Sequence, residues 1–88
     1  MSHLSPSQTL PVRNRIVAAT RNGRLQDWNE RIGEIAVLAK MDVAEINWAK
    51  EPKYVASDVV DYANRRLEVE GLERAIAEYE ATHPQSAG

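Results

Sequence analysis

Apolar residues recur along most of this chain at spacings of three and four, the period that places side chains on one face of an α-helix. The clearest pair of such stripes lies in residues 51–84. Polar and charged residues occupy the other faces, so each stripe predicts a helix that packs one side against a core. The residues predicted to point inward are Val55, Ala56, Val59, Tyr62, Ala63, Leu72, Ala75, Ile76 and Tyr79.

Proline and glycine mark the expected ends of these two helices. Pro52 is suited to a first helical turn, where its missing N–H costs no hydrogen bond. Gly71 is placed in the short acidic turn between the helices, and Pro84 comes where the second helix should stop. Residues 51–84 therefore predict a helical hairpin closed by a proline.

Two more helices are predicted upstream of this hairpin. The first is expected from Pro11 to Arg21, with Asn22-Gly23 as a left-handed C-terminal cap. The second begins at Leu25, and its apolar residues keep one phase across Gly33. A glycine inside a helix costs only about 1 kcal/mol relative to alanine, so one continuous helix fits the pattern, but we expect a bend or a break there. The predicted inward residues are Val12, Ile16, Ala19, Leu25, Trp28, Ile32, Ile35, Ala36 and Ala39.

A short helix is predicted between these two pairs. Asp42 followed three residues later by Glu45 resembles a capping box, and the helix should reach about Trp48. No stretch alternates apolar and polar residues as a strand does. The expected fold is therefore all-α, a compact bundle of five to six helices.

Length and composition describe one small domain with a thin core. The chain has 88 residues, of which 43% are hydrophobic, and a chain of this length buries only about 60–65% of its unfolded surface. We expect a helical domain over residues 10–84, between a flexible N-terminal segment 1–9 and a flexible tail or linker start 85–88. No run is long and apolar enough to cross a bilayer, so we expect a cytoplasmic protein without membrane contact.

The residues that carry common enzyme chemistry are absent or isolated. Cysteine is absent, and the two histidines, His3 and His83, stand at opposite ends of the chain without a second metal ligand nearby. The glycines form no phosphate-binding loop. Ser57 and Asp58 are adjacent on a helix and point about 100° apart, with no histidine to complete a triad. We therefore predict a protein that is not an enzyme and holds no metal or cofactor.

Charge is distributed unevenly along the chain. Residues 1–33 carry +3, because five arginines outnumber two acidic residues, and residues 34–66 carry −1. Residues 67–88 carry −4, because five glutamates face a single arginine. The net charge of −2 therefore conceals a basic beginning and an acidic end.

The sequence also predicts the surroundings of four individual side chains. Trp28 lies on the apolar stripe and should be in the core, whereas Trp48 beside a charged loop should be partly exposed. Arg66 falls on the inward side of its helix, so it must pair with an acidic residue, reach solvent or mark the helix end. His83 should pack against the last helix or cap its final carbonyls.

The closing hairpin resembles the C-terminal half of the bacterial effector-associated domain, type 1, a small death-like adaptor module. The likeness extends over roughly residues 12–84, and the family pattern favours a break at Gly33. The matching elements are Asp61-Tyr62-Ala63, Arg65-Arg66, Leu72 and Pro84, with Gly23-Arg24-Leu25 and Ile32-Gly33 upstream.

This resemblance implies a fold of the death-fold superfamily and a non-catalytic adaptor in a bacterial conflict or defence system. Its partner would be another copy of the same or a related domain, fused to a protease, an NTPase or another effector, or a homo-oligomer of this chain. If the basic and acidic regions lie apart, one copy can dock onto the next through complementary faces. The candidate interface residues are Arg13, Arg15, Arg21, Arg24, Glu70, Glu73, Glu80 and Trp48.

Two other functions fit parts of the sequence. A small helical nucleic-acid-binding regulator could use the N-terminal arginines to neutralise phosphates, although the acidic last helix and a pI near 5.6 argue against it. An accessory fragment of an enzyme would instead be stabilised by one specific partner.

Overall fold

The computed structural model describes residues 3–21 and 25–83, and within these ranges the chain forms four α-helices and one short 3-10 helix. No strand occurs in the described residues. The all-α prediction is confirmed, and the number of α-helices is four rather than five or six. The elements are α1 (Pro6–Thr20), α2 (Leu25–Leu38), η1 (Val43–Glu45), α3 (Pro52–Arg65) and α4 (Val69–Thr82).

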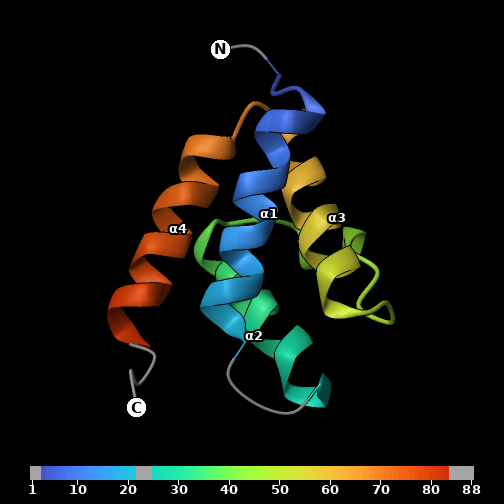
Figure 1. Cartoon of the computed structure of the whole chain (residues 1–88), viewed down its shortest axis with the longest axis vertical. Helices are drawn as coiled ribbons and strands as arrows, with labels where there is room; N and C mark the ends of the chain where they lie inside the picture. Colours follow the sequence, from blue (N-terminus) through green and yellow to red (C-terminus); the bar gives the residue numbers. More distant parts are fainter. Residues whose placement is uncertain (1–2, 22–24, 84–88) are drawn as a thin grey trace.

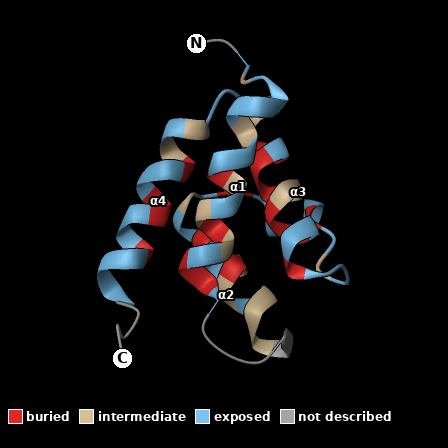
Figure 2. Cartoon of the chain, in the orientation of Figure 1, coloured by how far each residue is buried: buried red, intermediate tan, exposed pale blue. Residues whose placement is uncertain are grey.

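Each of the four α-helices contacts the other three, and α1 packs most extensively against α3. In Figure 1 α1 lies in front, between α4 on one side and α3 on the other, with α2 behind and below it. The helices therefore surround one core, which Figure 2 shows as buried patches on the faces that they turn toward one another.

The core consists largely of the predicted stripes. All nine predicted inward residues of α3 and α4 are buried, as are the three of α1. In α2, three inward residues are buried, whereas Trp28 packs partly buried against the core and the side chain of Leu25 lies outside the described part. Val60, Met41 and Ile46 are also buried, although no stripe identified them.

The start of α1 is five residues earlier than predicted. Pro6 occupies the first helical turn, and the Gln8 side chain accepts a hydrogen bond of 2.9 Å from the Ser5 N–H. Pro11, predicted as the first residue, lies inside the helix instead. Leu4, the residue before Ser5, is bound by Asn64 of α3. The Asn64 side-chain oxygen accepts the Leu4 N–H at 2.7 Å, and the Asn64 side-chain nitrogen donates to the Leu4 carbonyl at 3.1 Å. The folded part of the chain therefore extends into the segment 1–9. The predicted cap at residues 22–23 lies outside the described residues.

Both glycines predicted to interrupt helices lie inside them. Helix α2 continues through Gly33, so of the expected bend or break the break is wrong. A Cβ at this position would touch the Trp48 ring at 3.7 Å, so the bare backbone gives the indole a surface to cover. Gly71 lies in the first turns of α4 rather than in the connection before it. Pro52 does begin α3, as predicted.

The short helix after α2 is a single 3-10 turn. Asp42 is the N-cap, because its carboxylate accepts a hydrogen bond of 3.1 Å from the Ala44 N–H. The predicted capping box is wrong, since the Asp42 N–H donates to the Tyr62 hydroxyl and the Glu45 carboxylate pairs with Arg66. The turn ends at Glu45, so it does not reach Trp48. Residues 46–51 continue as an irregular loop that leads into α3.

Helices α2 and α3 end in the same motif, with a non-glycine residue in the left-handed conformation. After α2, Lys40 has a φ of 60°, and the Met41 N–H bonds the Ala36 carbonyl at 3.0 Å. After α3, Leu67 has a φ of 57°, and the next N–H bonds the Ala63 carbonyl at 2.8 Å. These bonds define Schellman motifs, in which glycine is usual because a Cβ crowds the left-handed backbone.

Glycine at either left-handed position is expected to stabilise the domain. Lys40→Gly and Leu67→Gly should each raise the free energy of unfolding by about 0.5–1 kcal/mol, because relief of the Cβ strain exceeds the entropy gained by the unfolded chain. Urea denaturation measures the change. Lys40→Ala is the matched control, since alanine keeps the Cβ. A glycine variant no more stable than the alanine variant would contradict the argument.

Candidate functional site

The basic and acidic regions of the chain meet inside the domain at one ion pair. Arg15 on α1 places Nη2 2.8 Å from Oε1 of Glu80 on α4, and both side chains are about two-fifths exposed. The hydrogen bond to Glu80 raises the pKa of the Arg15 guanidinium above its ordinary value, and the charge of Glu73 adds to this effect. At this pair the two regions do not lie apart, which was the condition for docking through complementary faces.

The other charged residues of the predicted interface belong to α1 and its end or to α4. Arg13 is partly exposed on α1 and bonds the side-chain oxygen of Asn14, at 2.8 Å from Nη2. Arg21 is exposed at the end of the same helix, and Arg24 lies outside the described residues. On α4, Glu70 and Glu73 are exposed. The structure thus brings together only one oppositely charged pair of the predicted set.

Arg66 has a structural role of the kind that was predicted. It caps α3, and its Nη2 lies 3.0 Å from Oε2 of Glu45 in η1. Its guanidinium also lies over the Tyr62 ring, 3.9 Å from the centroid. Because the Tyr62 hydroxyl accepts the N–H of Asp42 at 3.0 Å, two contacts fasten the 3-10 turn to α3.

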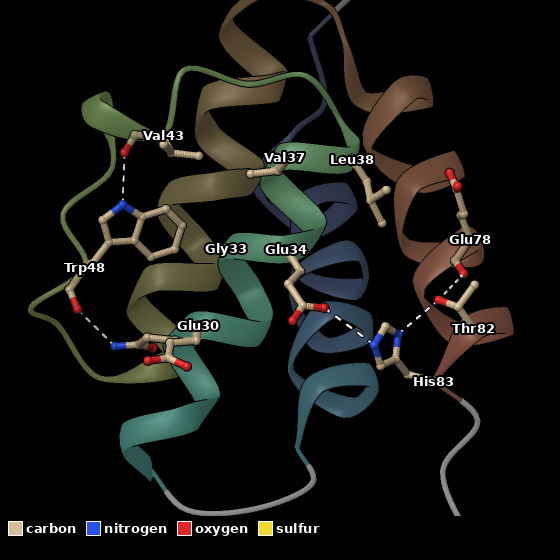
Figure 3. A pocket seen from close by; sticks show the side chains of 11 residues that line it. Glu30, Gly33, Glu34, Val37, Leu38, Val43, Trp48, Glu78, Thr82 and His83 are labelled. Carbon is tan, nitrogen blue, oxygen red and sulfur yellow. Dashed lines mark hydrogen bonds and ion pairs between the residues drawn. The ribbon is translucent and has the colours of Figure 1, made fainter.

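An apolar groove of about 970 Å³ lies between α2, the loop after it and the end of α4 (Figure 3). Three of its side chains are large, apolar and exposed: Val37 at 62%, Leu38 at 38% and Val43 at 37%. Trp48 forms one wall, and its indole packs over Gly33. The groove thus gathers four apolar side chains from two segments on one open surface.

Trp48 is held in place by hydrogen bonds at both ends. Its ring Nε1 donates to the Val43 carbonyl at 2.9 Å, as the dashed line in Figure 3 shows. The Asn29 side chain on α2 donates to the carbonyls of Trp48 and Lys50, at 3.0 and 2.9 Å. The side chain is partly buried, which confirms its predicted partial exposure. Hydrogen bonds to α2 and to Val43 therefore fix this wall of the groove in position.

Carboxylates surround the groove. Glu30, Glu34 and Glu78 line it, and no lysine or arginine does. His83 is the one other titratable side chain of the lining, with its Nε2 3.5 Å from Oε2 of Glu34. The groove can therefore offer apolar contacts, an indole ring and hydrogen-bond acceptors of negative charge.

His83 closes the end of α4 as predicted. Its backbone N–H donates to the Tyr79 carbonyl at 2.8 Å, and its ring stacks on the Tyr79 ring with centroids 4.2 Å apart. Burial raises the pKa of the Tyr79 phenol, with a further contribution from Glu34 that Arg31 opposes. These contacts fix the α4 side of the groove.

Sequence reasoning overlooked the groove, although a signal for it is present. Residues 35–39 are five consecutive apolar positions, Ile-Ala-Val-Leu-Ala, and one face of a helix cannot take all of them inward. Ile35 and Ala36 are buried, so Val37 and Leu38 are left toward solvent. A run of this kind in an otherwise amphipathic helix indicates an outward apolar patch.

The described part of the chain shows neither a membrane-spanning helix nor a metal-binding cluster. None of its helices has the length and apolar character to cross a bilayer. No three His, Cys, Asp or Glu side chains gather there in a way that could hold a metal ion.

Comparison with protein-family models, with curated proteins and with solved structures found no match. The resemblance to the effector-associated domain therefore stays a prediction.

Proposed function

We propose that this chain is a non-catalytic, cytoplasmic adaptor module of a bacterial conflict or defence signalling system. It binds another copy of the same or a related domain and so recruits an effector, such as a protease or an NTPase. The proposal includes a fold related to the death-fold superfamily. It combines the family resemblance with exposed arginines on and next to α1 and exposed glutamates on α4.

The observation that carries this proposal is the outward surface of α1. The helix contains no acidic residue, and its exposed side carries Arg13, with Arg21 directly after its end. Leu10 on the same side is 46% exposed, which offers an apolar contact beside the arginines. Pairing with Glu80 engages Arg15, so the arginines at 13 and 21 are the ones left to bind a partner.

The acidic residues proposed for the contact lie on α4. Glu70 and Glu73 are exposed there, and Glu73 is close enough to α1 for its charge to raise the pKa of Arg15. A basic surface of one copy that docks onto an acidic surface of the next makes a heterologous contact. Such a contact leaves a free surface at each end and can extend into a ring or an open chain.

Charge reversal on either surface is expected to abolish self-association. The double variant Arg13→Glu/Arg21→Glu and the double variant Glu70→Arg/Glu73→Arg should each be monomeric, because each leaves like charges facing one another. Mixing the two variants should restore a complex, since each supplies the surface that the other lost. Sedimentation velocity at high protein concentration and low salt measures these states.

The control is the exchanged pair Arg15→Glu/Glu80→Arg. It keeps the ion pair within the domain and should leave association largely intact, whereas reversing Glu80 alone would also disturb the fold. A wild-type chain that is strictly monomeric under these conditions, and that binds no second domain of its kind, overturns the proposal. Binding to duplex DNA that weakens steeply with salt would favour the nucleic-acid-binding alternative instead.

A further inference from the structure

The apolar groove gathers large apolar side chains in the open. Val37, Leu38 and Val43 meet there beside Trp48. A smaller adjoining hollow shares Leu38 with the groove and adds the exposed Leu67, so the apolar surface continues past the groove. The exposed Leu10 and Tyr54 belong to α1 and α3. Exposed apolar groups that are scattered singly are ordinary, whereas a contiguous patch rimmed by polar residues marks a binding surface.

The shape of the groove suits a helix. Its floor is one face of α2. Pairs of neighbouring residues that recur every four positions form this face, namely 29–30, 33–34 and 37–38. This face is roughly 14 Å long, because a helix rises about 1.5 Å per residue. At Gly33 the floor has no side chain of its own and the Trp48 ring packs against the backbone, and Figure 3 shows α4 on the opposite side of the groove. A trough of this kind accepts the apolar face of an amphipathic helix of about three turns.

The charge of the rim determines which helix fits. Glu30 and Glu34 stand along the floor and Glu78 on the α4 wall, with no lysine or arginine among the lining residues. His83 already lies beside Glu34. A helix that places leucine-like side chains on the floor would bring its flanking residues to these carboxylates, so lysine or arginine is favoured there and glutamate is repelled.

A second copy of this chain does not supply such a helix from its folded part. The helix without acidic residues, α1, has its apolar stripe of Val12, Ile16 and Ala19 buried in its own core. We propose that the groove binds a basic amphipathic helix of a different protein. This binding goes beyond self-association of the domain and needs only the monomer.

Titration with a synthetic peptide tests this inference. The probe is a helix of about four turns with leucine at helical spacing on one face and lysine on its flanks. Two control peptides are used: one with the same composition in scrambled order, and one with glutamate in place of lysine. Amide chemical shifts of the labelled protein locate the contact. The basic amphipathic peptide should shift residues 29–38, Val43 and Trp48, and bind at least about tenfold more tightly than either control.

Matched variants separate the apolar and the charged contributions. Val37→Ser should weaken binding by about tenfold, and Glu30→Lys/Glu34→Lys should do the same for the lysine-bearing peptide. Tyr54→Ser removes an apolar side chain of similar exposure on α3, and Asp61→Lys reverses an exposed charge there, so neither should change the affinity. The changed residues are exposed, and circular dichroism confirms that each variant is folded.

Three results overturn the inference. The first is equal binding of the ordered and scrambled peptides, which would show unspecific attraction of charge. The second is the absence of groove shifts at millimolar peptide. The third is that the groove residues shift when the protein concentration alone is raised, and that added peptide reverses this self-association. The occupant of the groove would then be a second copy of the chain. Loss of self-association in the α1 and α4 charge variants, with peptide binding intact, separates this inference from the proposed adaptor function.

Discussion

Replacing Ile16 with alanine is expected to lower the free energy of unfolding by about 2–5 kcal/mol. Ile16 has no exposed surface and lies on α1, which contacts α2, α3 and α4. The substitution removes buried carbon atoms and leaves a cavity in the shared hydrophobic core. Because small domains are stable by only about 5–15 kcal/mol, this single change removes a large fraction of the total.

Thermal and urea unfolding, followed by circular dichroism, measure this loss. For a domain of this size each kcal/mol corresponds to roughly 4–8 °C in the midpoint temperature, so the expected decrease is at least about 8 °C. Leu10→Ala on the same helix is the control, because Leu10 is 46% exposed and its truncation should change stability by no more than about 0.5 kcal/mol. Equal effects of the two changes would contradict the burial of Ile16 in the core.

Replacing Thr20 with valine is expected to cost about 1–3 kcal/mol, although valine has nearly the same shape. Thr20 is the one polar residue among those that are fully buried in the described structure. Its hydroxyl donates to the Ile16 carbonyl at 2.7 Å and accepts the indole Nε1–H of Trp28 at 2.8 Å. Valine would leave that indole donor without its partner in a partly buried position.

Two further variants isolate the hydroxyl contribution. Thr20→Ser keeps the hydroxyl and should recover most of the stability, losing only the methyl contact. In Trp28→Phe the donor is absent, so adding Thr20→Val to that background should cost much less than it does alone. An undiminished cost in the Trp28→Phe background would attribute the effect to packing rather than to the hydrogen bond.

Much of the fold was predictable because it follows from local periodicity. A helix with apolar residues at spacings of three and four buries them by turning one face toward the core. Val55, Val59, Leu72 and Ile76 are buried as this spacing requires. The helix ends were less predictable. Lys40 and Leu67 take the left-handed conformation that glycine usually supplies, and no local signal indicates them.

Glycine and proline gave wrong helix boundaries, because local signals do not report tertiary contacts. Gly33 and Pro11 read locally as a break and a start, yet both lie inside helices. At Gly33 the Trp48 ring covers the backbone, and this contact crosses 15 positions of sequence. A tertiary contact of this kind can offset a propensity cost of about 1 kcal/mol.

By itself the sequence determined the all-α class, the inward faces of the helices, the uneven charge and the absence of cysteine chemistry. Only the tertiary structure decided which surfaces are free to bind a partner. Arg15 and Glu80 are 65 residues apart in the chain, and packing of α1 against α4 pairs them at 2.8 Å. The groove likewise needs α2, the loop that holds Trp48, and the end of α4 to meet. Periodicity reports which side of one helix avoids water, whereas a binding surface depends on which neighbours cover the remaining sides.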